Sequence, residues 1–205
     1  MKKGTNVLIN IVLFVVVVFL AIKVIQSIQA PIKFGNEQKA RETQVIQRLK
    51  DIRDLEVQYK QANNCYTGSF DTLIRFCQTA EIPIVNIIPD PEDTTFTKTI
   101  NDTLGFVKVV DSLFGKRAGF NIADLRNVPF SNPTQEFELE AGTIVRSGIN
   151  VPVFQAQTPF EIYLKGLDNQ RILNAKAEKE AINRYAGMKV GSMEEASTEG
   201  NWDQL

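Results

Sequence analysis

An apolar run near the amino terminus constrains this chain more than any other feature. Two lysines precede the run, which extends from Val7 to Ile22 with Asn10 as its one polar residue and continues less purely to Ile28. At about 1.5 Å of rise per helical residue, it spans roughly 24 Å to Ile22 and roughly 33 Å to Ile28. Because the hydrocarbon core of a bilayer is about 30 Å thick, the sequence predicts an N-terminal transmembrane helix.

Secretory signal peptides have a similar pattern, but two features favour a retained anchor. The run is longer than the usual signal core of about 7–15 residues. No small-x-small exit follows it, since the nearest candidate has Ile28 and Ala30 before the cut and Pro31 after it. A buried core helix is disfavoured because the four valines at 15–18 and their neighbouring turns leave no polar face. We therefore expect residues 1–35 to form an uncleaved membrane anchor and a joint.

The orientation of this anchor is predicted from the length of the tail before it. Lysine and arginine residues lie on both sides of the run, so counting them does not decide the matter. A tail of this length rarely needs to be translocated, which favours an amino terminus in the cytoplasm. In a bacterium, the prediction is a single-pass inner-membrane protein with the bulk of the chain in the periplasm.

Composition excludes several classes of function. The net charge of −1 provides no basic field for nucleic acid, and the chain contains no histidine. Without histidine, Ser-His-Asp and Cys-His catalysis and His-ligated metal sites are excluded. The sequence has no glycine-rich phosphate loop, serine-hydrolase motif or calcium-loop spacing. We expect no enzyme, no catalytic or metal-ligating residues and no cofactor, and we expect the membrane and other proteins, including copies of this chain, as partners.

The two cysteines, Cys65 and Cys77, lie close together in the sequence. In an oxidising periplasm they would close a small loop, and a disulfide of this kind contributes a few kcal/mol. The sequence predicts this disulfide. A redox pair and two unpaired thiols, one of them buried, are the alternatives.

A second helix is predicted from Glu37 to Asn63, after an interruption at Pro31 and a joint at Gly35-Asn36. One face of it carries an apolar stripe, which consists of Val45, Leu49, Ile52, Leu55 and Tyr59. Two interpretations remain open. The stripe is either an interaction face for a protein partner, with spacings that also fit a coiled coil, or it packs against the chain's own β-sheet.

The pattern of residues 36–190 predicts a periplasmic α+β domain with a small, mostly antiparallel sheet and a C-terminal helix. Ser69 is expected to cap a short helix over 70–76, and Asp168 a helix that runs to Ile182. Extended segments are expected at 82–89, 104–114, 137–145, 151–157 and 160–164, the third and fourth as a hairpin around Ser147-Gly148, and a helical turn at 121–125. Residues 191–205 are small, polar and acidic, and predict a flexible tail.

A short pattern, Asp followed by Ser or Thr and then by an aliphatic residue or Thr, occurs four times. It resembles the acceptor motif of the general O-glycosylation system of Bacteroidota, which modifies exported proteins. The resemblance implies possible O-glycosylation at Thr72, Thr94, Thr103 and Ser112. The alternative is that these residues form Asx-turns and helix caps, where Asp-Thr is favoured.

The order of features over residues 1–77 carries a second resemblance. The apolar helix leads to an amphipathic helix, then to Tyr59-Lys-Gln-Ala-Asn-Asn-Cys-Tyr66 and Phe70-Asp-Thr-Leu73. This order resembles the front half of type IV pilins and pseudopilins, which implies a subunit of a secretion or pilus-like machine. It does not include the pilin leader, since no Gly-Phe cleavage site lies near the apolar run and no glutamate near the fifth mature position.

A third resemblance extends over most of the chain. It rests on Val151-Pro-Val-Phe154, Tyr163-Leu-Lys-Gly-Leu167, Gly187-Met-Lys-Val-Gly-Ser192 and Gly200-Asn-Trp202. These segments resemble an uncharacterised Bacteroidota family of single-pass inner-membrane proteins. The resemblance implies a location and no activity.

Three functions follow as hypotheses. The favoured one is a non-enzymatic, membrane-anchored envelope protein whose periplasmic domain scaffolds or docks to other envelope proteins. The second is a pilin-like or pseudopilin-like subunit, which requires N-terminal processing and polymerisation. The third is an envelope enzyme or ligand-binding domain, which requires a concave site with converging polar groups.

Overall fold

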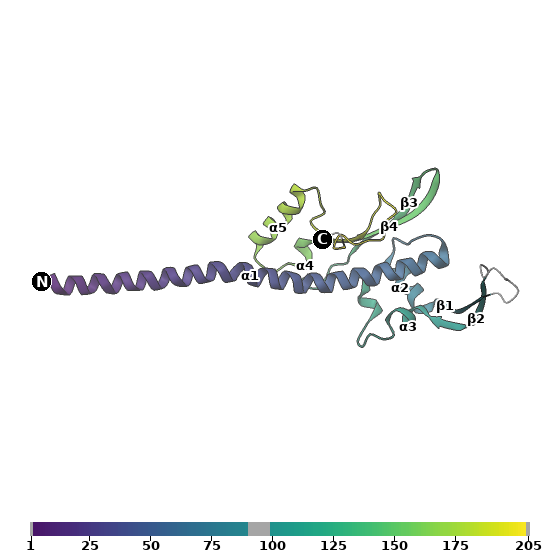
Figure 1. Ribbon diagram of the computed structural model, residues 1–205, viewed down its shortest axis with the longest axis horizontal. Helices are drawn as coiled ribbons and strands as arrows, with labels where there is room; N and C mark the ends of the chain where they lie inside the picture. The colour runs from purple at the N-terminus through teal and green to yellow at the C-terminus, as the bar shows by residue number, and fades with distance from the viewer. Residues whose placement is uncertain (1, 90–98, 204–205) are drawn as a thin grey trace.

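The protein has a mixed α+β fold built around one long helix (Figure 1). The computed structural model describes residues 2–89 and 99–203, and the side chains of residues 11–86 and 103–203. The elements are α1 (Lys2–Asn63), α2 (Phe70–Thr79), β1 (Glu81–Pro89), β2 (Thr99–Lys108), α3 (Val109–Phe114), the 3-10 helix η1 (Ile122–Arg126), β3 (Glu138–Arg146), β4 (Ile149–Pro159), α4 (Phe160–Tyr163), α5 (Asn169–Ala181) and β5 (Gly187–Gly191). The expected fold class is confirmed.

Helix α1 continues through Pro31, so the expected interruption between two helices is wrong. Proline removes one backbone hydrogen bond and crowds the preceding turn, which usually kinks or breaks a helix. Here long helical segments lie on both sides of the proline, and adding residues to an existing helix is far easier than nucleating a new one. The apolar run and the amphipathic segment therefore form one continuous element (Figure 1).

The C-terminal half of α1 forms the centre of the domain. Figure 1 shows α4, α5, β3 and β4 on one side of it, and α2, α3, β1 and β2 on the other. Val45, Leu49, Ile52 and Leu55 are fully buried, and α1 contacts α2, α3, η1, β4 and β5. Tyr59 is half-buried and packs edge-to-face on Phe76, with ring centroids 5.1 Å apart.

The apolar stripe is therefore internal, and its interpretation as an interaction face is wrong. The alternative, packing within the chain, describes it better, although helices as well as strands cover it. Burial of this face holds the domain against α1, since each fully buried aliphatic side chain contributes about 1.5–3 kcal/mol.

Strands β3, β4 and β5 form an antiparallel sheet with β4 in the middle. The expected β3–β4 hairpin is confirmed, and its turn lies at Ser147 and Gly148, whose φ angles are 52° and 79°. Two successive positive φ values match the twist of the adjoining strands. In register, Ala141 lies opposite Phe154, a fully buried residue of the core.

The C-terminal segment is ordered against β5 rather than flexible as expected. The Gly191 N–H donates to the Glu199 carbonyl and the Asn201 N–H to the Lys189 carbonyl, each at 3.0 Å. Trp202 packs against the hydrophobic core. These long-range contacts hold the segment up to residue 203, despite its polar and acidic composition.

Strands β1 and β2 form a separate antiparallel hairpin that projects from the domain (Figure 1). Two expected strands are partly or wholly wrong. The segment 104–114 changes from β2 to α3 after Lys108, where the β1–β2 ladder ends with a bond from the Val109 N–H to the Ala80 carbonyl at 3.0 Å. Residues 160–164 lie in and just after helix α4, which begins where the β4–β5 ladder ends with a bond from the Phe160 N–H to the Ala186 carbonyl.

Candidate functional site

The N-terminal half of α1 exposes its apolar side chains on every face. All residues from 11 to 33 are exposed, and the most apolar stretch has a mean hydropathy of 2.8 with none of it buried. A helix that is apolar all round is stable in the interior of a protein or in a lipid bilayer. Since no described part of this chain covers these residues, α1 is a candidate membrane span by length and composition.

The helix meets the domain directly after this exposed segment. Phe34 is half-buried and packs against the core. The Arg41 Nη1 atom donates to the carbonyl oxygens of Tyr163 and Lys165, each at 3.0 Å, and its guanidinium lies 5.1 Å from the ring centroid of Phe130. These contacts fasten the end of α4 to α1 within a few turns of the apolar segment.

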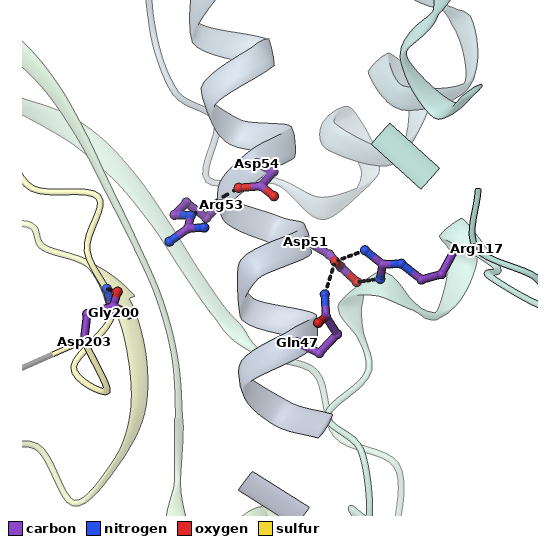
Figure 2. A network of polar contacts seen from close by, with 7 residues as sticks. All are labelled: Gln47, Asp51, Arg53, Asp54, Arg117, Gly200 and Asp203. Carbon is purple, nitrogen blue, oxygen red and sulfur yellow. Dashed lines mark hydrogen bonds and ion pairs between the residues drawn. The ribbon is translucent and has the colours of Figure 1, made fainter. Parts of the chain in front are cut away.

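A polar cavity of about 470 Å³ lies beside the buried half of α1. Its central side chain is Asp51, which is 4% exposed. Arg117 donates to both carboxylate oxygens of Asp51, at 2.7 and 2.8 Å, and the Gln47 amide donates at 3.1 Å (Figure 2). Figure 2 shows all three side chains pointing toward one another from α1 and from the segment after α3.

Three charged side chains of this cavity, Asp51, Arg117 and Arg48, have partners within the protein. The hydrogen bond to Asp51 raises the pKa of Arg117, whereas burial lowers the pKa of Arg48. Arg48 donates to the Asp124 carbonyl in η1. These bonds join α1 to the segment that contains α3 and η1.

Glu56 is a second buried acid on the same half of α1. Its side chain is fully buried, its Oε2 accepts a hydrogen bond from the Thr67 N–H at 3.1 Å, and its Oε1 has no hydrogen-bond partner. Burial raises the pKa of Glu56 to about 8. The carboxyl holds the loop between α1 and α2, and its burial favours the protonated form.

The expected Cys65–Cys77 disulfide is wrong. Both cysteines are free thiols, Cys65 exposed in the loop after α1 and Cys77 buried on the inner face of α2. The side chain of Cys77 points into the core, where burial raises the pKa of its thiol to about 11. Closeness in sequence does not bring the two sulfur atoms together, because α2 turns Cys77 away from the loop.

The predicted glycosylation sites lie on different elements. Thr72 is exposed in the first turn of α2, Thr103 is exposed on β2, and Ser112 is exposed on α3. Thr94 lies outside the described residues. Exposure makes the three described hydroxyls accessible, and their modification stays a prediction.

Within the described residues, no group of three or more histidine, cysteine, aspartate or glutamate side chains has the arrangement of a metal site. Comparison with known proteins finds no match to a family model, a curated protein or a solved structure. The functional argument therefore rests on the geometry of this chain.

Proposed function

We propose that this chain is a non-enzymatic envelope protein, anchored in the inner membrane through α1, whose periplasmic domain docks to other envelope proteins. One observation carries the proposal. A single helix presents an exposed apolar half and a second half that is the core of a domain. Such a helix fixes the domain at a set height above the bilayer, which suits a scaffold.

The hairpin β1–β2 supports the docking part of the proposal. Ile84, Val85, Leu104 and Phe106 are all more than 40% exposed on this hairpin. An isolated two-stranded hairpin is marginally stable in water, and exposed neighbouring apolar side chains are typical of interaction surfaces. The surface proposed for a partner is therefore this hairpin rather than the apolar stripe of α1.

The exposed thiol provides the test of location. We expect a membrane-impermeant maleimide to label Cys65 in reductant-treated spheroplasts, while buried Cys77 stays unlabelled. Cys65→Ser is the matched control and removes the signal. Labelling that requires lysis of the inner membrane would place the domain in the cytoplasm and contradict the proposed orientation.

The docking surface has its own test. Leu104→Asp with Phe106→Asp is expected to abolish cross-links to envelope partners while the domain stays folded, since both side chains are exposed. Val145→Asp with Ile149→Asp, at the exposed β3–β4 tip, is the matched control and should keep the cross-links. Unchanged cross-linking by the hairpin variant would contradict the assignment of this surface.

A pilin-like subunit is the second candidate, and the continuity of α1 favours it. One helix that runs from an apolar segment into the core of a domain, with an antiparallel sheet beside it, has the architecture that the resemblance to pilins implies. The intact mass of the protein from native membranes separates the two functions. A full-length mass supports the anchored scaffold, whereas loss of the first residues together with sedimentable filaments supports the pilin.

A further inference from the structure

A mainly apolar cavity of about 680 Å³ lies where α1 leaves its exposed apolar segment and meets the domain. Ile32, the last large apolar residue of that segment, is 57% exposed, and the lining of the cavity begins within the same turn. The other wall comes from the start of α5, which lies at the end of the domain nearest the apolar half of α1 (Figure 1). If α1 spans a bilayer, this cavity lies at the membrane surface.

The floor of the cavity is apolar. Phe34 of α1 and Leu167 before α5 line it, and both are half-buried against the hydrophobic core. Two cationic side chains, Lys33 and Arg171, also line it. Apolar side chains with cations beside them match a molecule that has an anionic group beside a hydrocarbon part.

The acidic residues of the lining already have partners within the protein. Glu37 pairs with Arg41 at 3.3 Å, and Asp168 accepts hydrogen bonds from the first N–H groups of α5. Asp168 also lies 3.5 Å from Arg171 Nε, which leaves the two terminal guanidinium nitrogens free to donate. No described carboxylate lies within ion-pair distance of Lys33, so the cationic groups are the ones open to a ligand.

We propose that this cavity binds the headgroup of an anionic membrane phospholipid. Lys33 and Arg171 hold the phosphate, and the glycerol and first acyl carbons lie over Phe34 and Leu167. The inference rests on the proposed membrane anchoring, because only then does the cavity face the lipid headgroups. Free inorganic phosphate would use the two cations but leave the apolar floor uncovered, so a lipid is the better occupant.

The experiment uses the full chain in nanodiscs made from an equimolar mixture of phosphatidylglycerol and phosphatidylcholine. Native mass spectrometry then identifies the lipids that stay bound when the protein is released. We expect phosphatidylglycerol to be retained in preference, and Lys33→Gln with Arg171→Gln to reduce this preference about tenfold. Lys39→Gln with Lys165→Gln is the charge-matched control outside the cavity, and it should retain the preference.

Four results would overturn the inference. Equal retention of both lipids would show that the cavity does not select the headgroup. The same conclusion would follow from a cavity variant with the thermal unfolding and the lipid preference of the wild type. Displacement of the lipid by millimolar inorganic phosphate would assign the site to free phosphate. A chain that does not enter nanodiscs overturns the membrane anchoring and this inference together, whereas insertion without selectivity overturns this inference alone.

Discussion

The two halves of α1 share one backbone and differ in what covers them. Before residue 34 every described side chain is exposed and most are apolar, whereas the second half carries an apolar stripe that is buried. No described part of the chain covers the first half, whereas the rest of the domain covers the apolar stripe of the second. The difference shows that a helix can be equally regular in both halves while its stability comes from two independent sources.

The largest expected effect separates these two sources. Val16→Asp with Val17→Asp places two charges near the centre of the apolar half, which should make membrane insertion less favourable by about 5–7 kcal/mol. The variant should float with liposomes far less than the wild type while its domain unfolds at the same temperature. Val145→Asp with Ile149→Asp controls for added charge on exposed apolar residues, and flotation unchanged by the α1 variant would contradict membrane anchoring.

The reverse effect is expected in the buried half. Leu49→Ala removes a fully buried side chain and leaves a cavity, which should lower the free energy of unfolding by about 2–5 kcal/mol. Denaturant unfolding of the full chain in detergent measures this change in the free energy of unfolding. Thr43→Ala, at an exposed position one to two turns away, should change the value by less than about 0.5 kcal/mol, and equal effects of both would mean that the stripe is not core.

A smaller effect is expected at the ion pair between α1 and the segment after α3. Arg117→Gln leaves the Asp51 carboxylate buried with one remaining donor side chain, which should cost about 1–3 kcal/mol of stability, a value limited by the 41% exposure of Arg117. Arg53→Gln is the matched control, because it breaks an exposed pair with Asp54 (Figure 2) and should cost less than about 1 kcal/mol. Similar losses in the two variants would show that burial of Asp51 does not matter.

The smallest effect, counted per pH unit, is the change in stability that the titration of Glu56 causes. Its pKa is raised in the folded state, so its stabilisation is complete below the ordinary value of 4.5 and is lost as the pH rises through about 8. Within that window this group should lower the free energy of unfolding by up to about 1.4 kcal/mol per pH unit. Glu56→Gln should remove this slope and Glu140→Gln, at an exposed position, should keep it, as measured by denaturant unfolding across pH.

Local signals in the sequence identified the elements that local contacts determine. Ser69 caps α2 through the Thr72 N–H, Asp168 caps α5, and Ser147-Gly148 turns the β3–β4 hairpin, all as expected. These features depend on residues a few positions apart. The sequence also identified the apolar run, because a transmembrane pattern needs no tertiary partner.

The errors arise where distant contacts decide the structure. Strand β5 is short, and its pairing with β4 depends on a partner far away in the chain, as does the ordering of the segment that ends at Trp202. The continuity of α1 through Pro31 is a different case, because it involves the helical segments directly on both sides of the proline.

Most of the candidate site could not be predicted from the sequence, because its residues meet through contacts between distant parts of the chain. Asp51 lies at the flank of the stripe, and its partner Arg117 is 66 positions away, so no local pattern connects them. Glu56 was the one usable signal, because an acid within an apolar stripe indicates either a break in the stripe or a buried carboxyl. The structure shows the second.

The central claim is that α1 is one helix that joins the apolar segment to the core of the domain. Spin labels are placed at Lys23→Cys and Thr43→Cys, on either side of Pro31, in a Cys65→Ser background within nanodiscs. Cys77 can stay in place because it is buried. Pulsed electron paramagnetic resonance then measures the distance between the two labels. A continuous helix predicts a single narrow distance of about 30 Å. A broad distribution that extends to much shorter distances would show two helices joined by a hinge and would contradict the account.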